Sequence, residues 1–341
     1  MISRDLRAAA ALVSVTVLAL ALWQVSFVLL LVFFAVLIAV GLRHPAQALA
    51  GWTGMPVNLA LALVVLLIVA ALGGFAMMQG MRILTQFEEL WTRIPEAVTG
   101  LEERLRDSRM GGMLVRRMEG SGEGGGMNVM GAIGGTLVTL GGAGANIVVV
   151  LTLSIFLATK PEFYRRGMVK LVPPQHRPRA DQICHDIGRG LWYWLLGQLV
   201  DMLAVAALVF LGLWLLGVPL PLTLALIAGL LNFVPFVGPI ISVVPAILVA
   251  LSEGMGTVVW VGLLYLTVQQ IEGNVIMPLV QQRTTAIPPA LTIVAVALFG
   301  VLFGLIGVLL ATPLLLVAMI LVQKLWVEDT LGDREDAQPE D

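Results

Sequence analysis

The chain has 341 residues, of which 59% are hydrophobic and 12% are charged, and its mean hydropathy is +0.96. Soluble domains carry about 25% charged residues, so the composition predicts an all-α polytopic membrane protein. The long uninterrupted apolar runs exclude an outer-membrane β-barrel, whose strands alternate apolar and polar residues. The net charge of −2 gives no indication of a nucleic-acid partner, and the single cysteine, Cys184, excludes a disulfide framework and a cysteine metal site.

The N-terminal segment contains an uncharged run of thirty-five residues, from residue 8 to residue 42. Because one span needs about 20 residues, we predict a pair of short helices that turn near Trp23–Gln24. A cleavable signal peptide is the alternative, since Ala19-Leu20-Ala21 resembles a cleavage site, but the apolar run continues beyond it. A third span is predicted over Val57–Gln79, so residues 1–79 would hold transmembrane helices 1–3.

Residues 80–135 differ in composition, with charges of both signs followed by many glycines. Seven apolar residues recur at alternating spacings of three and four: Leu84, Phe87, Trp91, Ile94, Val98, Leu101 and Leu105. This is the pattern of a heptad seam, which favours helix-to-helix contact between copies of the chain. An amphipathic helix on the membrane surface is the alternative. We expect Pro95 to split or kink the segment.

Eleven glycines lie between Glu119 and Asn146, but there is no GxxxxGK-(S/T) motif and no preceding strand, so we expect no nucleotide site. This stretch is expected to be a flexible connector leading into transmembrane helix 4, residues 136–159. Residues 160–193 form the most basic loop, with seven Lys and Arg residues against three acids by residue 189. The positive-inside rule places this loop in the cytoplasm, and four preceding spans would place the N-terminus there too.

Residues 194–323 form the predicted transmembrane core. Its run Met202–Ser252 has no charged residue and no histidine, yet it contains three prolines and a glycine in its middle. Each proline removes a backbone donor and blocks a helical hydrogen bond, so the helix should break at Pro235–Pro239. Residues 222–252 are too long for one upright span and too short for two, which predicts a re-entrant hairpin. Irregular backbone at membrane depth must be packed in protein or line a wet cavity, so this break is the predicted functional centre.

The remainder of the core has two parts. The next predicted span is Gly256–Ile276, with several polar side chains in its last turns. The run from residue 284 to residue 323 suffices for two short helices that bend at its glycines, and residues 324–341 form a polar, acidic tail. In total we expect about seven to eight transmembrane helices, a re-entrant broken-helix hairpin and an oligomeric assembly.

Several motifs spread over more than half of the chain resemble a known family. In the first part they are Pro161-Glu162-Phe163, Gly197-Gln198 and Asn232 with the Pro-x-x-Gly-Pro sequence at residues 235–239. Further on they are Gln270, Glu272, Asn274 and Pro278, then Pro288, and finally Gly300, Gly304, Gly307 and Pro313. Their order and spacing resemble the autoinducer-2 exporter family, a group of bacterial permeases. Phe236 and Ile287 depart from the family pattern, where tyrosine is frequent and many relatives have histidine, respectively.

The resemblance implies an inner-membrane transporter that is a homo-oligomer, with a pentamer suggested. Members of the family are linked to export of autoinducer-2 or to sodium/proton exchange. The resemblance therefore leaves the solute and the coupling ion open.

Glu272 is the strongest candidate for chemistry, because an intramembrane carboxylate is rare and usually faces a cavity or a partner. Gln269 precedes it by three residues on the same helical face, and Gln270 and Asn274 supply further amides. Together these groups could coordinate a cation or hydrogen-bond a small polyhydroxylated solute. The alternative is that Glu272 lies at the cytoplasmic end of its span, paired with Arg283 or exposed to water.

Other candidates surround the break. Asp201 suits a proton or cation role, with a buried structural pairing or an interfacial position as the alternatives. For Asn232, which can both donate and accept, we favour a helix cap over direct ligand contact. Pro235, Gly238 and Pro239 would act through their backbone, by exposing carbonyl groups and by forming a hinge.

The sequence therefore predicts an inner-membrane secondary transporter or exporter of small polar molecules, such as autoinducer-2 or a related solute, coupled to protons or sodium. A sodium/proton antiporter, or a non-coupled oligomeric channel or scaffold, is the alternative. The expected partners are the lipid bilayer, a small polar solute, a proton or sodium ion and further copies of the chain. We expect no enzymatic activity, no cofactor and no metal site, and we expect both termini in the cytoplasm.

Overall fold

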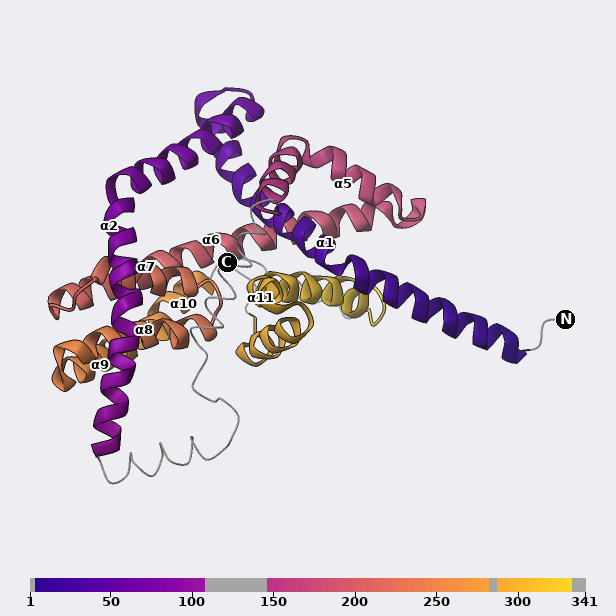
Figure 1. The fold of residues 1–341 in the computed structure, drawn as a ribbon. Helices are drawn as coiled ribbons and strands as arrows, with labels where there is room; N and C mark the ends of the chain where they lie inside the picture. Colours follow the sequence, from indigo (N-terminus) through magenta and orange to yellow (C-terminus); the bar gives the residue numbers. More distant parts are fainter. Residues whose placement is uncertain (1–3, 108–145, 282–286, 333–341) are drawn as a thin grey trace.

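A computed structural model describes residues 4–107, 146–281 and 287–332, and these residues contain helices and no strands. The helices are α1 (Arg4–Thr53), α2 (Val57–Asp107), an unlabelled helix Asn146–Thr159, α5 (Pro161–Lys170), α6 (Arg177–Leu215), α7 (Pro221–Leu231), α8 (Val237–Glu253), α9 (Met255–Ile271), α10 (Met277–Gln281) and α11 (Pro289–Leu321). A 3₁₀ turn, Pro174–His176, precedes α6, and π-helical turns follow α9 and α11 at Glu272–Ile276 and Val322–Glu328. The all-α prediction is confirmed for the described part of the chain (Figure 1).

Several of these helices can cross a membrane. Four candidate spans occur among the described residues: Gln24–Thr53, Val57–Met81, Pro174–Leu215 and Pro289–Glu328. A fifth is added if Asn146–Thr159 and α5, which meet at an angle of 87°, count as one broken span. The chain is thus a multi-pass membrane protein, but these candidates do not confirm the predicted seven to eight spans.

The predicted turn near Trp23–Gln24 is wrong, because α1 is one continuous helix of 50 residues. Neither proline nor glycine occurs between residues 8 and 40, so no residue there stops the helix. Residues 1–79 consequently hold two helices rather than three. The cytoplasmic position of the N-terminus was derived from four spans before the basic segment, and this number of spans is no longer supported. Figure 1 shows the N-terminal part of α1 extending away from the other helices.

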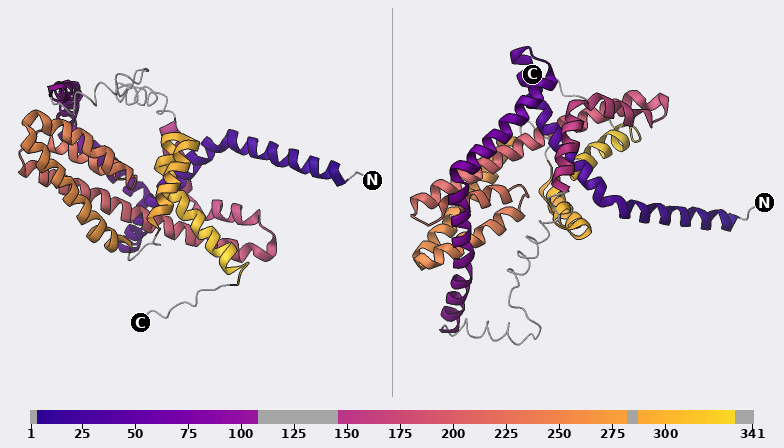
Figure 2. Two further views of the ribbon diagram at one scale, coloured as in Figure 1. Left: turned by 90° about the horizontal axis from the view of Figure 1, so that it is seen from below. Right: turned by 45° about the horizontal axis from the view of Figure 1, so that its top comes forward.

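Helices α6 to α9 form a bundle, and α2 lies against it (Figures 1 and 2). Its core consists of small and branched residues that include Val205, Val209 and Ala246. A Cβ atom on Gly229 of α7 would lie 2.8 Å from the Cβ of Ala206 in α6, so glycine permits this close approach. The bundle holds the predicted break between two packed helices.

The predicted bend in the last apolar run is confirmed at Gly304. Its φ of 62° and ψ of −146° interrupt α11, which therefore consists of two arms (Figure 2). A Cβ atom on Gly307 would overlap the carbonyl oxygen of Phe299, so the arms approach closely beside the bend. α11 also packs against α1 and α6.

The basic segment predicted as a loop over residues 160–193 is instead a helical hairpin made of α5 and the start of α6. Arg165 of α5 donates a hydrogen bond of 2.8 Å to Asp181 of α6 and one of 2.5 Å to Glu162. The hydrogen bond from Arg165 holds the pKa of the Glu162 carboxyl below its usual range. The charged side chains are thus paired across a short helical contact, which explains why this polar sequence is not irregular.

The tail predicted over residues 324–341 begins as helix. Arg179 of α6 donates a hydrogen bond of 2.7 Å to Glu328 and forms an ion pair of 2.9 Å with Asp329. The end of the last helix therefore lies beside the basic hairpin. Residues 333–341 lie outside the described residues.

The heptad segment is helical, since α2 continues through Pro95 to Asp107, so the expected split at Pro95 is wrong and a kink there stays a prediction. The side chains of the seam lie outside the described residues, as do residues 108–145 with most of the glycine-rich connector. Self-association through this seam therefore stays a prediction.

Candidate functional site

The predicted helix break is present between α7 and α8. It extends from Asn232 to Phe236, so it begins three residues before the predicted Pro235–Pro239. Gly238 and Pro239 lie in the first turn of α8, where a proline is tolerated because the backbone N–H at such positions has no helical acceptor. The sequence located the break, and the prolines mark its C-terminal edge.

Phe236 has an unusual backbone conformation at the end of this break. Its φ is 66° and its ψ is −43°, and the N–H of Val237 donates a hydrogen bond of 2.8 Å to the carbonyl of Pro235. This is a γ-turn with positive φ, which is rare and strained, and such conformations cost about 1–3 kcal/mol. Packing of Phe233 and Val234 against α11 supports the turn.

Gly238 is required by a close backbone contact. A Cβ atom at this position would overlap the carbonyl oxygen of Leu231, the last residue of α7. Only glycine lets α8 start directly against the end of α7, so the predicted importance of Gly238 has a steric basis.

Asn232 connects the break to α6. Its side chain is only 1% exposed, and its Nδ2 donates a hydrogen bond of 2.7 Å to Oδ2 of Asp201, which is itself 5% exposed. The favoured prediction of a capping side chain is therefore wrong, because the amide nitrogen of Asn232 donates to a carboxylate and its Oδ1 has no hydrogen-bond partner among the described residues. Of the alternatives for Asp201, the structure shows a buried pairing.

Gln198 was not among the site residues predicted from the sequence, yet its side chain also binds the backbone of the break. Its Nε2 donates a hydrogen bond of 2.9 Å to the backbone carbonyl of Asn232, so it pairs an acceptor that the broken helix leaves free. Gln198 lies one turn before Asp201 on the same face of α6. An amide three residues before an acid in an apolar helix is the sequence pattern that could have identified Gln198 as a site residue.

Glu272 approaches the same point from another helix. It is 6% exposed and accepts a hydrogen bond of 2.9 Å from Nε2 of Gln269. It also interacts with the amide of Asn232 and, electrostatically, with the carboxylate of Asp201. A water-exposed position for Glu272 is therefore wrong, and Arg283 lies outside the described residues. The structure brings Asp201, Asn232 and Glu272 together, and we call them the carboxylate cluster.

Glu272 begins the π-helical turn between α9 and α10. The N–H of Met277 donates to the carbonyl of Glu272, five residues earlier. Pro278 cannot donate to the carbonyl of Asn274 and crowds it, so the wider turn relieves that contact. Single π-helical turns occur frequently at functional sites.

The two remaining polar candidates do not join the cluster. Nδ2 of Asn274 donates a hydrogen bond of 2.9 Å to the carbonyl of Gln270, and both residues are exposed. The structure therefore separates Gln270 and Asn274 from the carboxylate of Glu272, although all three lie within one and a half turns of each other in sequence.

The carboxylate cluster lacks a positive charge among the described residues. Neither Asp201 nor Glu272 forms an ion pair with another described residue. Within the same residues, Oδ1 of Asp201 and Oδ1 of Asn232 are buried without a hydrogen-bond partner. Burying an ion costs several kcal/mol, and two neighbouring carboxylates repel one another. The cluster is therefore chemically suited to hold a proton or a small cation.

Three relatives of the chain have names that refer to transport or to a permease. YrrI of Bacillus subtilis is 30% identical over 185 residues, which cover 51% of this chain and 52% of YrrI. YhhT of Escherichia coli K12 is 33% identical over 149 residues, 43% of this chain and 41% of YhhT. PerM of the same organism is 27% identical over 169 residues, 49% of this chain and 48% of PerM. The names of these relatives assign the first two provisionally to transport and the third to a permease role.

The chain spans about half the length of these curated relatives. The family model described as AI-2E family transporter matches a much longer part, residues 12–326. That match covers α2, the break, the carboxylate cluster and α11 together. The chain belongs to the AI-2E transporter family.

Proposed function

We propose that this protein is a secondary transporter of the bacterial inner membrane that moves small polar molecules, and that the carboxylate cluster couples their movement to protons or sodium. The observation that carries the proposal is the meeting of Asp201 and Glu272 at a helix break. Both carboxylates are buried, and neither has a cationic partner among the described residues. Intramembrane acids of this kind commonly mark ion pathways.

The cluster can couple an ion to a conformational change because it joins separate elements. Asp201 belongs to α6, Asn232 to the break and Glu272 to the π-helical turn. Without a bound positive charge the two carboxylates repel one another, and with a proton or sodium ion between them they can approach. Occupancy would therefore change the relative stability of the α6, α7 and α9 contacts. Broken helices at membrane depth are where transporters commonly place their sites.

The membrane arrangement that we propose follows from helix lengths. α7 has 11 residues and is about 17 Å long, which is less than the roughly 30 Å hydrocarbon core. This favours a re-entrant hairpin made of α7 and α8. With the basic hairpin in the cytoplasm, the contacts of Arg179 with Glu328 and Asp329 favour the same side for the end of the last helix. The family resemblance supports a homo-oligomer, with a pentamer suggested, and autoinducer-2 or a related solute as cargo.

Vesicles reconstituted with the full chain and a trapped pH-sensitive dye test the function. Proton movement is followed after a sodium gradient is imposed, and again after gradients of small polyhydroxylated solutes. We expect proton movement that depends on one of these gradients. Solute conduction that is independent of proton and sodium gradients would indicate a channel instead. Absence of flux for every solute and ion would indicate a scaffold, and either result would overturn the proposal.

A further inference from the structure

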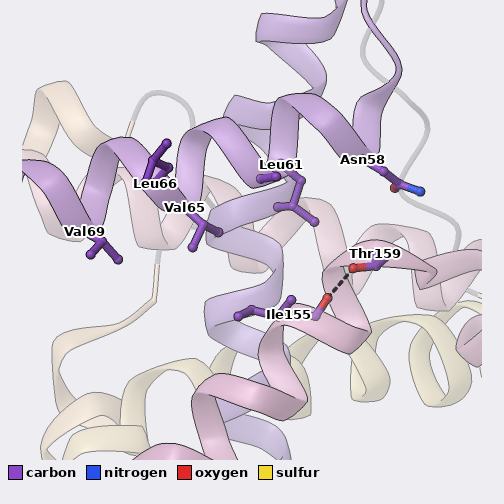
Figure 3. A pocket seen from close by; sticks show the side chains of 8 residues that line it. Asn58, Leu61, Val65, Leu66, Val69, Ile155 and Thr159 are labelled. Atoms are coloured by element: carbon purple, nitrogen blue, oxygen red, sulfur yellow. Dashed lines mark hydrogen bonds between the residues drawn. The ribbon is translucent and has the colours of Figure 1, made fainter.

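A groove lies between α2 and the helix Asn146–Thr159, away from the carboxylate cluster. Its volume is about 410 Å³, and it is lined by Asn58, Leu61, Ala62, Val65, Leu66, Val69, Ile155 and Thr159 (Figure 3). All of these residues belong to α2 or to the facing helix, and none to the α6–α9 bundle.

The two ends of the groove differ in polarity. Asn58 provides an amide at one end, where Thr159 donates its hydroxyl hydrogen to the carbonyl of Ile155 at 2.7 Å, whereas Leu66 and Val69 line the other end with hydrocarbon (Figure 3). Asn58 lies in the first turn of α2 and Thr159 ends the facing helix. The polar end therefore coincides with the ends of two helices that can cross or enter the membrane, and the apolar end lies deeper.

The length and volume of the groove indicate what fits it. From Asn58 to Val69 the axis of α2 rises by about 17 Å, so the groove follows about three turns of this helix. A stretched hydrocarbon chain, whose neighbours approach to about 4 Å, has a cross-section of roughly 15–20 Å². A volume of 410 Å³ over that length has room for one acyl chain laid along α2.

Basic groups lie beside the polar end. Lys160 follows Thr159 directly and is exposed, and its ammonium makes no ion pair within the described residues. Arg43 donates a hydrogen bond of 3.1 Å to the carbonyl of Ala158, and its Nε is buried without a partner among the same residues. Glu162, the acid that interacts with Arg43, is already bound by Arg165 at 2.5 Å. The local charge favours an anion.

We propose that this groove binds an anionic phospholipid, with one acyl chain along α2 and the phosphate at the end formed by Asn58, Thr159 and Lys160. Each part of the lipid meets matching chemistry, since the chain lies against leucine and valine and the phosphate lies near Arg43. Anionic lipids are enriched on the cytoplasmic surface of membranes and attract lysine and arginine there. That agrees with a cytoplasmic position for the basic hairpin.

Native mass spectrometry of the purified full chain, stripped of lipid and then given phosphatidylglycerol or phosphatidylcholine, tests the proposal. Ala62→Phe is the test variant, because its phenyl ring fills the groove. Leu67→Phe is the matched control, because it places a phenyl ring on an exposed part of α2 outside the groove. Bound phosphatidylglycerol should fall at least tenfold in Ala62→Phe, because each buried CH₂ contributes roughly a factor of four. Leu67→Phe should bind as the unmodified chain does.

The headgroup is tested by Lys160→Gln, with the exposed Arg166→Gln as its control. Lys160→Gln should lower bound phosphatidylglycerol about fivefold, which is the effect of one cation near an anionic surface, whereas Arg166→Gln should leave it unchanged. Thermal unfolding followed by circular dichroism verifies that each variant is folded. Equal binding of the two lipids by the unmodified chain would overturn the proposal. Undiminished binding by folded Ala62→Phe would do so as well.

Discussion

Asn232 donates a hydrogen bond of 2.7 Å from its side-chain amide to Oδ2 of Asp201, and this bond joins the break between α7 and α8 to the interior of α6. The two residues are thirty-one positions apart in sequence, and both are buried. An amide that serves a carboxylate rather than a helix end makes the break part of an ionisable site. The geometry of the break and the chemistry of Asp201 therefore depend on one another.

The Asp201–Asn232 bond should appear as an energetic coupling. Asn232→Leu removes the donor from a buried acceptor and is expected to lower the free energy of unfolding by about 2–3 kcal/mol. Asp201→Leu should cost a similar amount, and the double variant should cost less than the sum, with a coupling of about 1–3 kcal/mol. Denaturant unfolding in detergent micelles measures all three. Gln270→Leu, at an exposed position, should change the free energy by no more than about 0.5 kcal/mol. Strict additivity would show that the bond is not formed.

Gly238 offers a test of the helix break that does not involve a charge. Gly238→Ala introduces a Cβ atom that overlaps the carbonyl oxygen of Leu231, and the resulting overpacking should cost about 1–3 kcal/mol or more. Gly262→Ala is the matched control, because a Cβ atom there has no neighbour within 4 Å and alanine favours a helix. Thermal unfolding of both variants gives the comparison. Equal stability of the two would contradict the observed contact.

The positions of the helix ends were predictable where proline or glycine marks them. Pro56 directly precedes α2, Pro221 begins α7, and Gly304 bends α11. The turn near Trp23–Gln24 was predicted from span length alone, and no local residue enforces it. The prediction of a loop at residues 160–193 was wrong because it took a high density of charges as a sign of irregular structure. The charges of this segment pair across two helices, such as Arg165 with Asp181, and a sequence does not display such pairing.

The bend at Gly304 should depend on backbone conformation rather than on packing. Its φ is positive, but a Cβ atom there would meet nothing within 4 Å. Gly304→Ala should therefore cost about 1–3 kcal/mol through conformational strain alone. Gly256→Ala in α9 has equal space and no positive φ, so it should be neutral or stabilising. Unfolding in detergent compares the two, and a neutral Gly304→Ala would show that α11 is straight at this point.

Arg179 should hold the end of the last helix against the basic hairpin. Arg179→Gln removes its ion pairs with Glu328 and Asp329. Partly exposed ion pairs contribute about 0–1 kcal/mol each, so global stability should change little. Hydrogen exchange of residues 322–331 should nevertheless become faster, while Arg166→Gln leaves it unchanged. Unaltered exchange in Arg179→Gln would mean that other contacts hold this segment.

The candidate site was predictable in its members and not in its connections. Glu272, Asp201 and Asn232 were each identifiable as polar groups in apolar segments. Their meeting depends on the close packing of α7 on α6 at Gly229 and on the π-helical turn at Glu272. The packing at Gly229 does not follow from a local pattern, and Pro278, which favours the wider turn, does not indicate which residues Glu272 meets. For the same reason Gln270 and Asn274 were grouped with Glu272, although the helix places them on its exposed side.

Ion-driven flux in reconstituted vesicles tests the coupling role of the carboxylate cluster most directly. Glu272→Gln and Asp201→Asn keep the size of each side chain and remove its charge, and Gln270→Ala serves as the exposed control. Flux driven by a proton or sodium gradient should fall to the level of empty vesicles in both carboxylate variants and persist in the control. Undiminished gradient-driven flux in folded Glu272→Gln and Asp201→Asn would contradict the coupling role.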